Sequence, residues 1–600
     1  MSGIYLCILI FLLCLAIFDL FVGVSNDAVN FLQPAVGARV VKFRTILIVA
    51  SCGVILGAIM SSGMMDVARH GIMMPDHFSF NEVMIIFLSV MVTDVMVLDV
   101  FNSLGLPTST TVSIVFDLLG GTFALATIKI AHNSALSYSV LLNSSKALNV
   151  IIAIFVSVAI AFFFGVIVMW ISRIFFTFSY KKHLKYIIAI FGGIAFTTLA
   201  YFIFLKGLGT SPYISDTARN YINVNTNRLL VYTFIASTII MEILYLLHIN
   251  IFKFIVLMGT FALAMAFAGN DLVNFIGVPL AGLSSFQDYI ANAHGAAPSD
   301  FMMNSLMASA KTPPAYLLIA GIIMIIAIGT SKKAQKVIKT SVDLSRQDEG
   351  DEMFGSSKAA RALVRFTQNT GNAITTIMPD KLVTWINSRF NKNEVILTDD
   401  KAAFDLVRAS INLVLSAMLI TIGTNHKLPL STTYITFMVA MGSSLADRAW
   451  SRESAVFRVT GVLSVIGGWF ITAGVAFITC GIVCLIMYFG GFPVQLLFMA
   501  LVIFLLIRSN RRYAKKEKKQ DEEDDSFRLM MRLRDPELVW DLLKKHVSHT
   551  QSYENQFALK EYNQILNGLA YEDVRSLRHA NRELKNEQNN QKKYRRQEML

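Results

Sequence analysis

Charged residues are scarce in this chain. Only 16% of its 600 residues are Asp, Glu, Lys or Arg, and 54% are hydrophobic, whereas a soluble protein carries roughly 25% charged residues. This composition excludes an ordinary water-soluble domain. Lipid is therefore the expected solvent for most of the chain.

Cysteine is also scarce and shows no pattern. The five cysteines have no CxxC spacing and no neighbouring histidine, so the sequence predicts neither a disulfide framework nor a cysteine metal site. The motifs HExxH and GxSxG are missing too, and no base is paired with the membrane hydroxyl groups. We therefore expect no enzyme activity and no cofactor.

The excess of basic residues does not indicate a nucleic-acid partner. The net charge is +12, but the Lys and Arg residues lie in loops and in a C-terminal tail beside apolar segments. In such places they orient a membrane protein, with the basic loops in the cytoplasm. We expect contact with membrane lipid and none with nucleic acid.

Long apolar runs are what the chain does contain. A helix needs about 20 apolar residues to cross a bilayer. The opening run lacks a basic start and a small-residue cleavage site, so it is predicted to be a retained helix and not a signal peptide. The first six runs cover residues 4–24, 46–65, 150–170, 186–204, 229–247 and 251–268, and several more follow residue 316.

Two short motifs occur twice, in the same order. The sequence SNDAVNF at 25–31 recurs as GNDLVNF at 269–275, and LPTSTT at 106–111 recurs as LPLSTT at 428–433. Two motifs repeated in order predict a duplicated unit.

The basic clusters suggest how the two units are oriented. Cytoplasmic placement of residues 39–44, 173–185 and 331–401 puts the N-terminus outside. The apolar segments that flank each LPxSTT motif then pair as re-entrant hairpins, and one odd crossing at 229–247 inverts the second unit. The hairpin segments are 83–101 with 112–126, and 409–423 with 434–446.

The predicted fold is an all-α membrane protein with two inverted repeats. Each repeat has a motif helix, further transmembrane helices and a re-entrant hairpin. We expect a multi-pass protein of the plasma or inner membrane. The predicted parts are a first repeat (1–228), a linking transmembrane helix (229–250), the first part of the second repeat (251–330), a cytoplasmic loop (331–402), the second part of that repeat (403–507) and a cytoplasmic helical tail (508–600).

The Asn-Asp motifs predict a cation site. A carboxylate buried in an apolar helix costs several kcal/mol unless it has a partner, so Asp27 and Asp271 require a cation or a proton. A helix broken at the motif would add backbone carbonyls to the amide oxygens, a hard-oxygen set that suits sodium. One copy alone would be read as a helix cap, but the duplication favours a site. The predicted cation ligands are Asp27, Asn30, Asp271 and Asn274.

The hydroxyl motifs predict an anion site. A proline before the hydroxyl residues favours the start of a new helix there. Free N–H groups, the positive end of the helix dipole and hydroxyl donors together bind phosphate without Lys or Arg. Helix capping alone is the competing interpretation. The predicted substrate ligands are Ser109, Thr110, Thr111, Ser431, Thr432, Thr433, Asn26 and Asn270.

At these four motifs the chain resembles the inorganic phosphate transporter (PiT) family, whose repeats carry GANDVAN-like and GLPVSTTH-like signatures. The resemblance implies a phosphate symporter that is dimeric and coupled to sodium or protons, with the hydroxyl motifs at phosphate and the Asn-Asp motifs around the ion. The chain departs from the family at Val112 and Tyr434, where a His often follows, and at Phe116 and Asp117.

Three alternatives stay open at this point. Sodium is favoured over a proton as the coupling ion, but both neutralise an aspartate. Asp99 and Asp117 lie in the first hairpin without counterparts in the second, and they are secondary candidates for a cation or proton site. The transported anion could be another oxyanion such as sulfate, and a membrane sensor that signals through the C-terminal tail is the alternative from another class.

Overall fold

A computed structural model gives the arrangement of the chain. It describes residues 2–104, 108–178, 184–201, 215–308, 312–331, 379–390, 402–448, 452–532 and 536–581, with isolated positions in 338–369 and 583–587. By its internal contacts the chain divides into two units, Met1–Leu506 and Ile507–Leu600. Gly105, Leu106 and Pro107 of the first hydroxyl motif, and most of the 331–402 loop, lie outside the described residues.

The described residues are helical, with isolated bridges and no strand. Nine of their helices are long and apolar enough to cross a membrane, so the predicted all-α membrane class is confirmed. The first half contains α1 (Ser2–Asp27), α2 (Val29–Gly37), α3 (Phe43–Met60), α4 (Asp66–His70), α5 (Phe80–Leu104), α6 (Thr110–His132), α7 (Tyr138–Leu141), α8 (Ser144–Phe176) and α9 (Leu184–Ala200). The rest contains α11 (Asp216–Leu246), α12 (Ile251–Asn292), α13 (Pro314–Thr330), α16 (Asp380–Arg389), α17 (Leu406–Asn425), α18 (Thr432–Ala446), α19 (Arg452–Arg532) and α20 (Pro536–Ala570).

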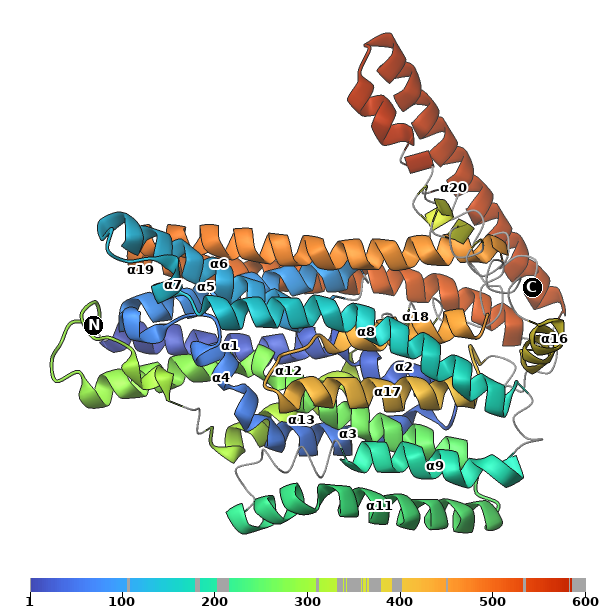
Figure 1. Ribbon diagram of the computed structural model, residues 1–600. Coiled ribbons are helices and arrows are strands. Elements are labelled where there is room, and N and C mark those ends of the chain that lie inside the picture. The colour runs from blue at the N-terminus through green and yellow to red at the C-terminus, as the bar shows by residue number, and fades with distance from the viewer. Residues whose placement is uncertain are drawn as a thin grey trace. The chain divides into compact units, whose positions relative to one another are not determined.

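Helix α12 is the organising element of the first unit. It contacts α1, α2, α3, α5 and α17, and the long helices of this unit run roughly side by side (Figure 1). Gly57 allows α3 and α12 to approach closely, since a Cβ there would overlap the carbonyl oxygen of Met265. Small residues serve the same purpose in many membrane helix pairs, because lipid provides no hydrophobic force between helices.

Two glycines at corresponding positions let α6 and α18, the helices that follow the two LPxSTT motifs, pack closely against a helix of the other half. Aligning Thr110 with Thr432 places Gly120 opposite Gly442. A Cβ at Gly120 would overlap the carbonyl oxygen of Phe477 in α19, and one at Gly442 would overlap that of Phe162 in α8. Thus α6 packs on α19, and α18 packs on α8.

A helix broken at each Asn-Asp motif was the expectation, but the second motif lies in a continuous helix and the first lies at the junction of α1 and α2. Helix α12 runs without interruption through residues 270–274. Between α1 and α2, Ala28 keeps helical angles and its N–H bonds to Val24. The backbone carbonyls of the second motif therefore stay within the helical hydrogen bonds, and both motifs offer side-chain oxygens.

The LPxSTT motifs lie between paired helices. Helix α5 ends just before the first motif and α6 begins within it, at Thr110. In the same way, α17 and α18 flank the second motif, and α18 begins at Thr432. Both starts agree with the predicted beginning of a helix at the hydroxyl residues. We call α5–α6 hairpin one and α17–α18 hairpin two.

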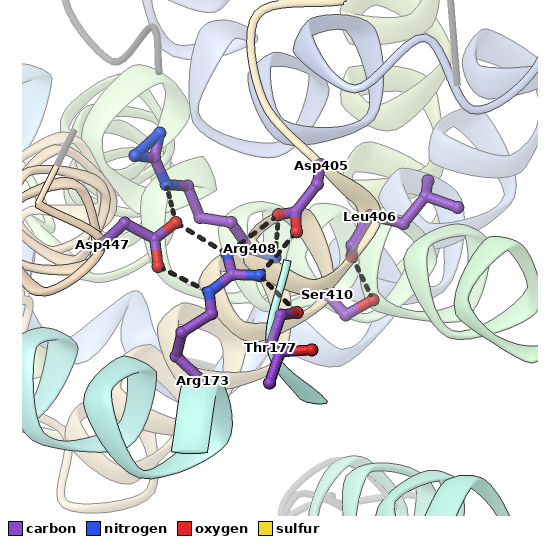
Figure 2. A network of polar contacts seen from close by, with 7 residues as sticks. All are labelled: Arg173, Thr177, Asp405, Leu406, Arg408, Ser410 and Asp447. Carbon is purple, nitrogen blue, oxygen red and sulfur yellow. Dashed lines mark hydrogen bonds and ion pairs between the residues drawn. The ribbon is translucent and has the colours of Figure 1, made fainter. Parts of the chain in front are cut away.

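A buried ionic network joins both ends of hairpin two to the end of α8. Arg173, fully buried, donates to Asp405 (Nη1–Oδ2 2.7 Å) and to Asp447 (Nη2–Oδ2 2.7 Å). Asp405 also caps α17 by accepting a hydrogen bond from the backbone N–H of Arg408. The side chain of Arg408 joins the network too, since its Nε lies 3.2 Å from Oδ2 of Asp447. Figure 2 shows the Arg173 guanidinium between the two carboxylates. The network fixes the start of α17 and the end of α18 at one place.

Removal of Arg173 should therefore loosen hairpin two. Breaking a buried ion pair by removing one partner costs about 3 to 5 kcal/mol, so we expect Arg173→Met to lower the thermal unfolding temperature of the purified protein by several degrees. Thermal unfolding in detergent, followed by loss of the monodisperse species, measures this. The exposed Arg44 provides the matched control, Arg44→Met, which should unfold like wild type. An unchanged unfolding temperature in Arg173→Met would contradict the role of the network.

Candidate functional site

All the residues predicted to bind substrate or cation meet in one buried cluster, which we call the central network. They come from α1, α2, α12 and the tips of both hairpins, and each is at most 4% exposed. They are Asn26, Asp27, Asn30, Ser109, Thr110, Thr111, Asn270, Asp271, Asn274, Ser431, Thr432 and Thr433. Segments far apart in the sequence thus contribute to one site.

Asp27 accepts hydrogen bonds from both hairpin tips. The hydroxyl of Thr110 donates to its Oδ2 at 2.8 Å, and that of Thr433 donates to its Oδ1 at 3.1 Å. The side-chain amide of Asn26 adds a third bond at 3.2 Å. One carboxylate on α1 is therefore held by hairpin one and by hairpin two.

Asp271 has the matching set of donors. Thr111 of hairpin one donates to its Oδ1 at 3.0 Å, and Thr432 of hairpin two donates to its Oδ2. The amides of Asn270 and Asn274 bond to Oδ1 at 2.8 and 3.2 Å. Each aspartate thus takes one hydroxyl donor from each tip.

The asparagines fix the tips against the motif helices. Asn26 donates to the backbone carbonyl of Thr108 at 2.7 Å, and Asn270 donates to that of Leu430, also at 2.7 Å. Asn30 donates to the hydroxyl of Thr433 at 3.0 Å. Asn274 does the same for Thr111 at 2.9 Å. The contacts of these asparagines with the two tips are therefore matched between the first and the second Asn-Asp motif.

The serines differ in role from the threonines beside them. Ser109 accepts from the N–H of Val112, and Ser431 accepts from that of Tyr434, both at 3.2 Å. They cap α6 and α18, which is the competing interpretation weighed for the whole motif. The threonine hydroxyls point instead to the aspartates. The capping interpretation is thus correct for the serines, and it does not account for the threonines.

Two hydroxyl groups outside the motifs complete the central network. Thr436 donates to the side-chain oxygen of Asn30 at 3.1 Å, and Thr424 donates to that of Asn270 at 3.3 Å. A small cavity reaches the network at Asn30, Thr436 and Thr433, and Ser341 from the 331–402 loop also lines it. Both threonines lie within seven residues of the second motif, but no sequence pattern marks them.

The secondary candidates lie apart from the central network. Asp117 is fully buried on α6 and accepts from Ser113 at 3.3 Å. Asp99 is buried on α5. Sequence analysis missed Asp19 and Asp94, both buried near Asp117. The rule that an acid within a membrane segment is a functional candidate would have found them.

The chemistry of the central network is that of hard oxygen ligands and neutral donors. Two buried carboxylates are surrounded by amides and hydroxyls, and the hydrogen bonds that hold them come from no Lys or Arg among the described residues. Within that part of the chain no group of three His, Cys, Asp or Glu side chains could hold a metal ion. The donor set does not fit a transition metal, whereas carboxylate and amide oxygens suit a monovalent hard cation.

The side-chain oxygen Oδ1 of Asn26 is the one amide oxygen of the motifs that the structure records as buried without a donor among the described residues. It belongs to the residue next to Asp27 and lies inside the network. A buried acceptor without a donor costs about 1 to 3 kcal/mol. A cation bound to this oxygen would therefore be stabilising.

Comparisons with known proteins identify a similar fold and a family. A solved structure described as "The sodium-dependent phosphate transporter" superposes with a TM-score of 0.54 and 18% identity, over 80% of this chain and 99% of that one. At this identity the likeness shows a shared fold. No curated protein sequence matches the chain. The sequence profile of the phosphate transporter family matches residues 23–343, more than half of the chain. The chain belongs to the phosphate transporter family and is a multi-pass membrane protein.

Proposed function

We propose that this protein is a secondary active transporter that carries inorganic phosphate together with a cation, sodium in preference to a proton. The observation that carries the proposal is the pairing of each aspartate with one threonine from each hairpin tip. The family of the chain supports phosphate as the substrate. It also supports a transport function and not an enzymatic one.

Phosphate would bind between the two tips. The hydroxyls of Thr110, Thr111, Thr432 and Thr433 converge there, and α6 and α18 both begin at the tips. The N-termini of these helices offer backbone N–H groups and a positive dipole end to an anion. In the structure the threonine hydroxyls donate to the aspartate carboxylates. When phosphate binds, its oxygens would replace the carboxylate oxygens as acceptors of these hydrogen bonds.

The cation follows from electrostatics. Two buried carboxylates and a phosphate ion would place at least three negative charges in a medium of low dielectric constant. A cation beside Asp27 and another beside Asp271 would offset that repulsion. Sodium is favoured because amide and carboxylate oxygens are its ligands and because the Asn26 oxygen lacks a donor among the described residues. Asn30 and Asn274 would complete the shell.

The topology proposed with this function is a pair of inverted repeats. Hairpin one would enter from outside and hairpin two from the cytoplasm, which is the arrangement of many secondary transporters. The matched contacts of Asp27 and Asp271 support two equivalent units. The chain would form a homodimer in the plasma or inner membrane, with the 331–402 loop and the 508–600 tail in the cytoplasm.

A permease for sulfate is the second candidate within transport, since hydroxyls and helix ends recognise a tetrahedral oxyanion by shape and charge. Competition of sulfate with phosphate uptake would separate the two. A sensor that signals through the tail is the candidate from another class. If the protein acts as a transporter and not as a sensor, deletion of the tail after residue 507 should leave phosphate uptake intact.

The aspartates should be required for cation coupling. In proteoliposomes with a sodium gradient, and with the proton gradient collapsed, we expect wild-type protein to accumulate phosphate. Asp27→Asn and Asp271→Asn remove the charge that recruits the cation, so each should abolish sodium-driven uptake. Glu242→Gln on α11 serves as a matched control outside the central network. Uptake that follows only the proton gradient in wild type would overturn the sodium assignment.

The threonine pairs should share one phosphate ion. Replacing Thr110 and Thr111 with Val, or separately Thr432 and Thr433, keeps side-chain volume but removes donors worth about 1 to 3 kcal/mol each. Each double variant should weaken equilibrium phosphate binding at saturating sodium at least roughly tenfold. Thr127→Val, an exposed hydroxyl near the end of α6, should leave binding unchanged. Wild-type affinity in either double variant would exclude a site shared by both tips.

The two hairpins should open to opposite sides of the membrane. Single cysteines at Asn102, near the tip of hairpin one, and at Asn425, near that of hairpin two, can be labelled with membrane-impermeant reagents in a chain whose own cysteines are replaced. We expect labelling of Asn102→Cys from outside and of Asn425→Cys from the cytoplasmic side. Labelling of both positions from the same side would refute the inversion, whatever the substrate is.

A further inference from the structure

A second group of carboxyl groups lies inside the first half of the bundle. Asp19 on α1, Asp94 on α5 and Asp117 on α6 are each at most 1% exposed. The carboxyl groups of Asp19 and Asp94 lie close enough to share a hydrogen bond, and Asp117 is a near neighbour of both. None of these three residues belongs to the central network.

This group lacks the donors that hold the central aspartates. Both side-chain oxygens of Asp19 are buried and have no donor among the described residues, and the same is true of Oδ1 in Asp94 and in Asp117. Ser113 donates to the other oxygen of Asp117. The groups whose charges act most strongly on Asp19 are Asp94, Asp27 and Asp117, all acidic. Ionised carboxylates crowded in this way repel one another strongly.

The other titratable side chains that face the group do not offset its charge. Helix α19 contributes Cys480, which lies near Asp117 and 3.8 Å from the Ser89 hydroxyl, and Cys484 beside it. Asp27 lies further along α1, about 12 Å from Asp19 by helix rise. The group therefore needs a bound positive charge of its own.

The second half of the chain has no such group. When Asp27 is aligned with Asp271, and Thr110 with Thr432, Asp19 corresponds to Leu263. Asp94 and Asp117 correspond to Ser416 and Val439. The three carboxyl groups are thus an addition to the first half and not part of the duplicated site.

We propose that Asp19 and Asp94 form a proton-binding site in which the two carboxyl groups share one proton, with Asp117 as its acidic neighbour. A proton fits because two ionised carboxylates in hydrogen-bonding contact repel one another, whereas one shared proton turns the contact into a hydrogen bond. In the described residues no group of three acidic, His or Cys side chains could hold a metal ion. The proton exchanges with water, and no other bond is made or broken.

The site would act on the central network through its charge. Loss of the shared proton places one more negative charge near Asp27, which opposes an anion there and favours a cation. Phosphate affinity should therefore fall as the pH rises through the titration of the site. This role in transport rests on the proposed function, whereas the existence of the proton does not.

The proton can be tested without phosphate. In the full-length protein near neutral pH, infrared spectroscopy should detect the carbonyl stretch of a protonated carboxylic acid. Asp19→Asn and Asp94→Asn should each remove the same band, because each removes one of the two groups that share the proton. Asp288 is a partly exposed carboxylate near the end of α12 that accepts from the side-chain amide of Asn292. Asp288→Asn should leave the spectrum unchanged in that region.

Two further measurements keep the test decisive. If the single variants do not fold, the double variant Asp19→Leu and Asp94→Ser, which installs the residues found at the corresponding positions of the second half, should also lack the band. The band that depends on Asp19 and Asp94 should be present both in sodium chloride and in choline chloride at one pH. Persistence of the band in the folded variants, or its disappearance when sodium replaces choline, would overturn the proton site even if phosphate uptake is confirmed.

Discussion

Two buried carboxylates that have no basic partner among the described residues are the constraint on which the rest of the structure depends. Asp27 and Asp271 can be placed there only because neutral donors reach them from several helices. Those donors are brought together by the two hairpin tips and held by asparagines on the motif helices. The helix packing, the breaks in the hairpins and the small residues between helices all serve this one arrangement.

The chain treats structural and functional carboxylates in opposite ways. At the base of hairpin two, Asp405 and Asp447 are paired with Arg173 in short charge-assisted bonds, which hold the groups permanently ionised and fixed. In the central network the donors to the aspartates among the described residues are hydroxyl and amide groups. These donors stabilise a carboxylate without cancelling its charge, so in the proposed function the charge would stay available to an ion that can also leave.

The fold class and the central network were predictable because local patterns in the sequence indicate both. The length of the apolar runs reflects the thickness of the bilayer, and the repeated Asn-Asp and Ser-Thr-Thr motifs marked the residues that meet at Asp27 and Asp271. The uninterrupted course of α12 was not predictable, since short polar motifs occur in broken and in continuous membrane helices alike. Arg173 was grouped with the cytoplasmic basic residues, but the structure buries it completely, because its partners Asp405 and Asp447 lie far away in the sequence. Thr424 and Thr436 were missed for the same reason.

The close packing of α6 on α19 at Gly120 also determines when the protein can be completed during its synthesis. The carbonyl of Phe477 that covers Gly120 is translated more than three hundred residues later, which takes roughly 20 to 70 seconds at typical rates of synthesis. Thr433, the second hydroxyl donor to Asp27, arrives nearly as late. Throughout that interval the first-made half has an uncovered groove and a carboxylate that lacks half of its hydroxyl donors. Lipid, water or an insertion chaperone must occupy both places until the last helices enter the membrane.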